Sequence, residues 1–147
     1  MKLTSTLLAA ATTLLAPSVS ANSYTLCCCT KLTYPQDSMD FRIFYDPRSR
    51  DLNIPSKQCD RAATKTIVDI MHGHFAFTTH FWYAQKNVPR YRGDSYIYAT
   101  AIDGDDNLIG QKEMEGWCAK QKAQRYCWSP GPEDLYDYKG AKLKGTP

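Results

Sequence analysis

The chain has 147 residues, of which 43% are hydrophobic and 22% are charged, and its formal net charge is +3. This length fits one domain, and the ordinary charged fraction excludes a globally disordered chain. The small net charge is not typical of a nucleic-acid-binding protein, and the only long apolar run is N-terminal, which excludes a membrane protein with several spans.

Residues 1–21 have the pattern of an export signal. A lysine precedes the apolar run at 3–15, and small residues predict cleavage between Ala21 and Asn22. The apolar run is shorter than the roughly 20 residues that a membrane span needs. The processed chain would have 126 residues with 17 basic and 15 acidic side chains, and we expect it to be secreted and extracellular.

The first half of the mature chain predicts one short strand and one helix. Residues 41–45 form the strand, which an Asp-Pro turn closes. Ser56 is the predicted N-cap of a helix that runs from Lys57 to His72 and ends before Gly73. The apolar positions that follow helical spacing are Ala63, Ile67, Ile70 and Met71.

Three strands are predicted after this helix. Residues 75–83 alternate aromatic and polar side chains, which indicates a long half-buried strand whose aromatic face is turned inward. Residues 95–103 and 108–114 are the second and third strands, joined by a hairpin loop at 104–107. The inward side chains expected to cover the helix are Phe75, Phe77, Phe81 and Tyr83.

The C-terminal part predicts little further structure. Residues 119–126 form a short helix or loop between two cysteines, and residues 129–147 lack apolar periodicity. The predicted organisation is therefore a signal peptide (1–21), a disulfide-stabilised domain (22–128) and a flexible C-terminal tail (129–147). The predicted fold class is α+β, with one helix packed on a small antiparallel sheet that three disulfides staple.

Six cysteines in an exported chain predict three disulfides. Cys27, Cys28 and Cys29 are consecutive, and a disulfide needs a Cα separation of about 5.5–6 Å, so bonds within this triplet are disfavoured. Each then pairs with a distant cysteine, which leaves six connectivities. In an extended triplet, Cys27 and Cys29 face one side and Cys28 the other, so this strand becomes a hub. The distant cysteines are Cys59, Cys118 and Cys127.

The sequence has no pattern that requires catalysis or a cofactor. His74 and His80 would lie about 20 Å apart on the predicted strand, too far to share a metal, and the cysteine triplet lacks zinc-site spacing. We predict no catalytic residue, metal or cofactor. A tripeptide at 92–94 matches an integrin motif, but a turn before a strand explains its glycine equally well. A ribonuclease-type acid–base pair could draw on His80, Glu113, Glu115, Arg90 and Arg92.

Aromatic residues are the main clue to a working surface. Ten tyrosines, five phenylalanines and three tryptophans are many for this length, and tyrosine and tryptophan suit interfaces. If the aromatic face of 75–83 covers the helix, the opposite face turns His74, His80 and Trp82 to solvent. An exposed tryptophan there is costly unless it is used. We therefore predict that these three residues bind a partner.

In layout the chain resembles the small secreted cysteine-rich proteins of filamentous fungi, many of which are effector candidates. The resemblance rests on the signal peptide, the short mature domain, the cysteine triplet at 27–29, and the Trp-Cys and Cys-Trp pairs at 117–118 and 127–128. One subgroup is similar in element order to the guanyl-specific fungal ribonucleases. Here residues 108–114 carry no histidine, which departs from that pattern.

The resemblance implies a monomeric, non-enzymatic effector that binds a host protein or other host macromolecule, at or in host tissue, through an aromatic-rich surface. The alternatives are a ribonuclease-like hydrolase or a degenerate relative of one, and a secreted toxin or antimicrobial protein. The near-neutral charge and the absence of a basic amphipathic helix argue against nucleic acid or membrane as the partner.

Overall fold

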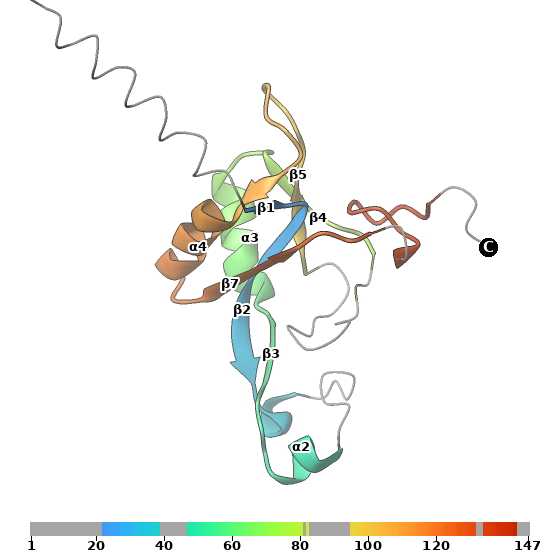
Figure 1. Cartoon of the computed structure of the whole chain (residues 1–147). Coiled ribbons are helices and arrows are strands. Elements are labelled where there is room, and N and C mark those ends of the chain that lie inside the picture. Colours follow the sequence, from blue (N-terminus) through green and yellow to red (C-terminus); the bar gives the residue numbers. More distant parts are fainter. Residues whose placement is uncertain (1–21, 39–46, 81, 83–94, 132–133, 144–147) are drawn as a thin grey trace, which may run out of the picture.

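The computed structural model describes residues 22–38, 47–80, 82, 95–131 and 134–143. Within these residues, an antiparallel sheet carries helices on one face (Figure 1). The predicted export signal at 1–21, the predicted strand at 41–45 and the arginine-containing segment at 90–94 lie outside the described residues.

The strand that contains the cysteine triplet is the centre of the main sheet. β5 and β7 both pair with Cys27, so they lie on opposite edges of β2. β3 and β7 both pair with Thr30, so β3 also lies on the edge opposite β7. β4 pairs with β5, and every pair is antiparallel, as predicted. The strands are β2 (Leu26–Thr33), β3 (Ser56–Cys59), β4 (Phe75–Phe77), β5 (Ile97–Ala99) and β7 (Gln124–Trp128).

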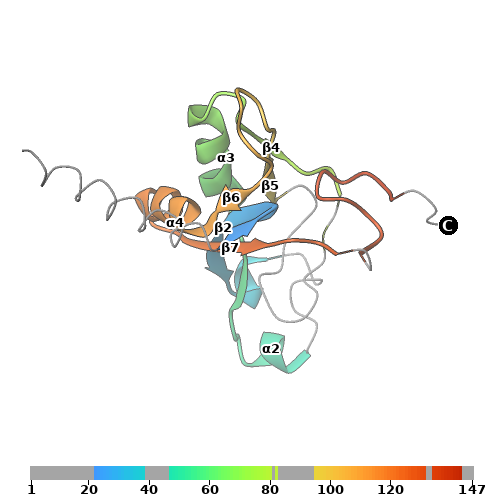
Figure 2. The ribbon, with the colours of Figure 1, turned by 45° about the horizontal axis from the view of Figure 1, so that its top comes forward.

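Two helices connect these strands across the same face of the sheet. α3 (Arg61–Ile70) precedes β4, and α4 (Gln111–Lys120) precedes β7 (Figures 1 and 2). β2 and β4 run parallel with β5 between them, and β5 and β7 run parallel with β2 between them. The path from β5 through α4 to β7 is therefore a split β-α-β unit, whereas α3 follows β3, which runs antiparallel to β4.

The remaining elements are short. β1 and β6 form a separate antiparallel pair beside α4. A 3₁₀ turn and α2 lie beyond the far end of β2 (Figure 1). The bounds are β1 (Ser23–Tyr24), η2 (Pro35–Asp37), α2 (Pro47–Asp51) and β6 (Ile109–Gly110). The fold is therefore mixed helix and sheet, and the prediction of a single helix is wrong.

Three disulfides tie the rest of the domain to β2. They join Cys27 to Cys127, Cys28 to Cys59, and Cys29 to Cys118, and none of the six cysteines is free. Each member of the triplet pairs with a distant cysteine, as predicted. Cys27 and Cys29 lie in the core beneath the helices, whereas Cys28 lies in the core on the opposite face. The hub predicted from the triplet is confirmed.

α3 begins later than the sequence predicts. Residues 56–59 pair with β2 as β3, because the Cys28–Cys59 disulfide holds them to the sheet. Asp60, not Ser56, is the N-cap, and its carboxylate accepts the Ala63 N–H. Thr64, Ile67 and Met71 lie on the side of α3 that faces the core. Ile70, which the sequence places on this side, lies outside it and is 55% exposed.

The predicted strands after α3 are too long. β4 ends at Phe77. The Thr78 N–H still bonds to the Tyr96 carbonyl at 2.9 Å, and the Thr79 N–H, on the edge away from β5, bonds to the Lys139 carbonyl of the C-terminal segment. β5 covers only residues 97–99, since Ala101 and Asp103 adopt positive φ angles of 59° and 53° and turn the chain.

The predicted strand at 108–114 is wrong. Only Ile109 and Gly110 are extended, and α4 follows directly. Met114, Trp117 and Cys118 are spaced so that all three face the core under the helix, and the disulfide from Cys118 to β2 holds that face down.

Residues 134–143 differ from the unstructured tail that the sequence predicts. Tyr136 pairs with Lys142 in an isolated bridge, and Tyr136 and Tyr138 pack against the core on the sheet face opposite the helices. This face, with Leu26, Cys28 and the aromatic rings around them, is covered by the chain's own C-terminal segment.

Candidate functional site

A cleft of about 850 Å³ opens between the start of α4, the β1–β6 pair and the loop that follows β5. Its deeper part is apolar, because Phe75, Ala99 and Ile109 are buried core residues. Met71, Leu108 and Trp117 extend this apolar lining. We call this site the acidic cleft, because its polar lining includes Asp105, Asp106, Glu113 and Glu115, with Lys112 and His74.

The sheet register places His74 at the cleft. Phe75 pairs with Ala99, and the His74 carbonyl accepts the Thr100 N–H at 3.0 Å. His74 therefore lies beside the loop that leaves β5. Asp105 in that loop contacts the imidazole Nδ1 at 2.7 Å, and the Asp103 carboxylate lies 3.8 Å from Nε2. The imidazole thus links β4 to the loop that forms one wall of the cleft.

The opposite wall is the first turn of α4. The Gln111 N–H donates to the Asn22 carbonyl at 3.0 Å, which closes the start of the helix against β1. Glu113 and Glu115 follow in the exposed part of the same helix. Acidic side chains are favourable in a first helical turn because they face the positive end of the helix dipole.

The charge of the cleft is negative. Its described lining carries four carboxylates, one lysine and one histidine. These carboxylates are exposed and surround an apolar floor on which the Phe75 and Trp117 rings meet edge to face at 5.5 Å. The site can therefore hold a group that has both an apolar body and a positive charge.

The three residues that the sequence predicts as a partner surface do not share one face. His74 lines the acidic cleft, whereas His80 and Trp82 lie on the opposite side of the sheet, among the aromatic rings. Trp82 is only 2% exposed, so its predicted exposure to solvent is wrong. The sequence predicts a strand that continues to residue 83, whereas β4 ends at Phe77, six residues earlier.

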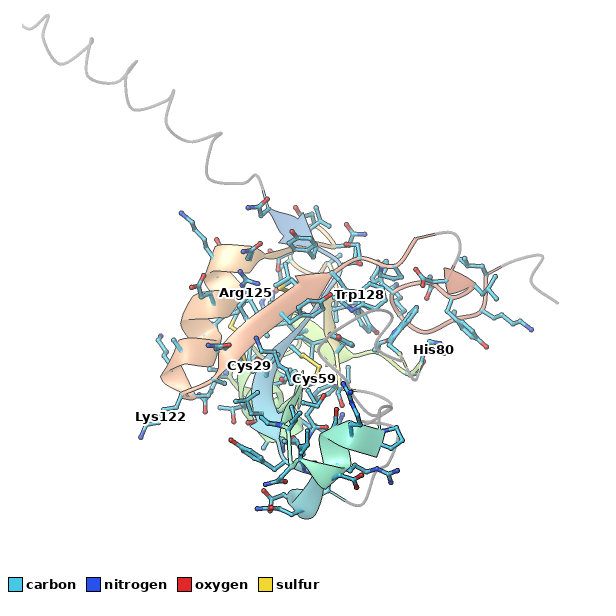
Figure 3. All side chains as sticks on the ribbon, turned by 60° about the horizontal axis from the view of Figure 1, so that its bottom comes forward. Cys29, Cys59, His80, Lys122, Arg125 and Trp128 are labelled. Atoms are coloured by element: carbon cyan, nitrogen blue, oxygen red, sulfur yellow. A yellow bond between two sulfur atoms is a disulfide. The ribbon has the colours of Figure 1, made fainter. Side chains whose placement is uncertain are left out.

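His80 lies under the C-terminal segment. Its ring stacks on Tyr136 with a centroid distance of 3.7 Å and meets Trp82 edge to face at 4.5 Å. Figure 3 shows His80 beside this segment and Trp128 at the end of β7. Burial lowers the pKa of His80 below its ordinary value, and the nearby Asp134 charge opposes part of this effect.

Deeper in the same aromatic face, burial raises the pKa of Tyr96 well above its ordinary value, and it also raises the pKa of Tyr126. The rings of these two tyrosines lie 6.5 Å apart. Both therefore stay neutral at physiological pH and act as packing groups.

Asp105 and Trp117 are site residues that the sequence analysis missed. The sequence predicts the hairpin loop at 104–107, but His74 reaches this loop only through the pairing of β4 with β5, which the sequence does not show. From the sequence, Trp117 stands out only as the neighbour of Cys118. Its place in the cleft follows from the helical spacing of residues 111–120.

Comparison with protein-family models, with curated proteins and with solved structures finds no match for this chain. Among the described residues, no cluster of three or more metal-ligating side chains occurs. In the same part of the chain, no helix has the length and apolar character to cross a membrane.

Proposed function

We propose that this protein is a secreted effector that acts by binding a host macromolecule, without catalysis, and that the partner binds in the acidic cleft. The observation that carries this proposal is an apolar floor surrounded by carboxylates in one concave site. The site is built on strands and helices that three disulfides hold together. A preorganised site loses little conformational entropy when its partner binds.

The chemistry of the cleft favours a basic segment of a partner protein. Lysine and arginine have apolar stems that can cover Phe75 and Trp117, and cationic ends that can reach Glu113 or Asp105. An aromatic ring beside a cation adds a further attraction. We therefore place the partner-binding surface at the acidic cleft, on the side of the sheet opposite the aromatic face that the sequence indicates.

The same charges argue against the ribonuclease alternative. A ribonuclease binds a polyanion and must stabilise extra negative charge in the transition state, which needs cations. The cleft instead has four carboxylates and one lysine. Of the residues considered for an acid–base pair, Glu113 and Glu115 lie at the cleft and His80 lies on the other face of the sheet.

Isothermal titration calorimetry tests this proposal with a capped decapeptide in which leucine alternates with lysine and arginine. A matched peptide has glutamate at the basic positions. We expect the mature protein to bind only the basic peptide, more weakly at high salt. Because an exposed ion pair contributes about 0.2–1 kcal/mol, the double variant Glu113→Gln/Glu115→Gln should bind roughly 2- to 30-fold more weakly.

Asp69→Asn is the matched control, because Asp69 lies on the exposed side of α3, where it pairs with Lys65 outside the cleft. This variant should bind the basic peptide as the parent does. Equal binding by the double variant and the parent would contradict the proposal. Hydrolysis of RNA by the parent, lost in His74→Ala, would favour the hydrolase instead.

A further inference from the structure

β7 is an edge strand of the main sheet. Its five residues pair with β2 in one continuous register, and no other strand in the described part of the chain pairs with it. Residues 124–128 contain no proline and the register contains no bulge, which are two common ways of protecting a strand edge. The outer edge of β7 can therefore accept a further strand.

The register determines which backbone groups of β7 point outward. Cys29 lies opposite Arg125, but the Cys29 carbonyl accepts the Asp60 N–H at 2.6 Å and so points away from β7. The Cα atoms of Cys27 and Cys127 lie 4.1 Å apart, close to the roughly 4.5 Å of a pair that exchanges no backbone hydrogen bonds. The N–H and C=O groups of Arg125 and Cys127 therefore point away from β2, towards the outer edge.

These outward groups can satisfy one another in a second copy of the chain. Among the described residues, neither Arg125 nor Cys127 has a backbone partner on this edge. An antiparallel pairing centred on Tyr126 places Arg125 of each copy opposite Cys127 of the other, and each such pair exchanges both of its hydrogen bonds. The two Tyr126 rings then meet on the aromatic side of the sheet, and no like charges are directly opposite.

The charges along α4 favour a second copy as the partner. α4 turns back into β7 through residues 121–123 and packs along it, so the helix and the strand run antiparallel (Figure 3). In its first half the exposed Glu113 and Glu115 outnumber Lys112, whereas the exposed Lys120 and Lys122 lie at its end. A two-fold axis reverses the second helix, so the acidic half of each α4 comes level with the basic end of the other.

We propose that two copies of this chain pair through β7, so that their sheets join into one continuous sheet about a two-fold axis at Tyr126. We call this line of pairing the seam. The outward backbone groups supply its hydrogen bonds, and the reversed charges of α4 supply its electrostatic complementarity. The proposal concerns the edge of the sheet and does not depend on the proposed function.

Arg125→Pro tests the seam and leaves the pairing with β2 intact. Proline has no N–H, and the N–H that it removes is an outward one, so only the seam loses a donor and gains a bulky ring. Arg125→Gln is the matched control, because it removes the charge and keeps the N–H. We expect the glutamine variant to dimerise like the parent and the proline variant to dimerise roughly tenfold to a hundredfold more weakly.

Light scattering during size-exclusion chromatography measures this dimerisation for the mature protein, up to a concentration of about 1 mM. Circular dichroism and the absence of free thiols show whether each variant is folded. A parent that stays monomeric throughout this range would overturn the proposal. Equal dimerisation by the parent and a folded Arg125→Pro variant would also overturn it.

Amide hydrogen exchange of the parent tests the seam without any substitution. The Tyr126 N–H points to β2, so its protection should not depend on protein concentration. The N–H groups of Arg125 and Cys127 should exchange fast in dilute protein and become protected as the concentration rises through the dimerisation range. Protection of these two groups that does not change with concentration would contradict the seam, even if a dimer forms.

Charge reversal tests the antiparallel arrangement of the two helices. Lys120→Glu/Lys122→Glu and Glu113→Lys/Glu115→Lys should each weaken dimerisation roughly tenfold, because like charges then come level across the seam. The variant that combines all four substitutions again has opposite charges there, and it should dimerise nearly as well as the parent. Losses that add in the combined variant would contradict this arrangement.

Discussion

Replacement of Trp82 by alanine should lower the free energy of unfolding by about 4 kcal/mol, within the range of about 3–5 for buried tryptophans. The side chain is 2% exposed, and its ring centroid lies 4.5 Å from that of His80 and 5.3 Å from that of Trp128. Burying 150–250 Å² of aromatic surface contributes roughly 4–6 kcal/mol at about 25 cal/mol per Å². The indole N–H also donates to the Thr78 hydroxyl at 3.3 Å, which adds about 1 kcal/mol. Partial collapse of the cavity recovers some of this total.

Guanidinium denaturation of the mature protein, with its disulfides intact, measures this loss. Trp82→Phe is the matched control, because it keeps most of the apolar volume, and it should cost less than half as much as the alanine variant. A Trp82→Ala variant within about 1 kcal/mol of the parent would refute the reasoning, since surface substitutions usually fall in that range. It would place the indole at the surface and restore it as a partner contact.

Three further outcomes are expected. Gly116→Ala should raise the free energy of unfolding by about 0.5–1 kcal/mol in the same denaturation assay, because Gly116 lies inside α4 and a Cβ there meets nothing within 4 Å. Thiol titration of the folded protein should find no free cysteine, and reduction should abolish the fold; two free thiols would contradict the disulfide framework. Burial lowers the pKa of His80, so this histidine binds a proton more tightly in the unfolded chain than in the folded protein. The contribution of His80 to the free energy of unfolding is therefore complete above about pH 6.5 and declines at lower pH. The stability difference between the parent and His80→Gln should narrow between pH 7.5 and 5, and a difference that does not change with pH would contradict the assignment.

The disulfide framework could be predicted because it rests on local covalent geometry. Disulfides within three consecutive cysteines are disfavoured, and the alternation of these residues along an extended strand determines which side each one faces. The choice among six connectivities could not be made from sequence, because it depends on which strands neighbour β2. Cys127 pairs with Cys27 only because β7 lies directly beside β2 in that register.

The errors in the predicted elements come from contacts distant in sequence. Alternation after Phe77 indicated a continuing strand, but the backbone of Thr79 bonds to Lys139, sixty residues later. Glycine is unfavourable inside a helix, yet Gly116 lies on the exposed side of α4, where this cost is small beside the burial of Met114 and Cys118. The cleft was missed for the same reason, because it forms only when α4 packs beside the loop that contains Asp105.

The most direct test of the proposed function is a titration of the ¹⁵N-labelled mature protein with the basic decapeptide, followed by NMR. The chemical shifts of the backbone amide groups and of the tryptophan indole N–H groups are recorded. The account predicts saturable shifts at the Trp117 indole, at His74 and at residues 105–115, with little change at Trp82 or Tyr98. Shifts confined to the aromatic face, or no saturable shift at millimolar peptide, would contradict the assignment of the acidic cleft as the binding site.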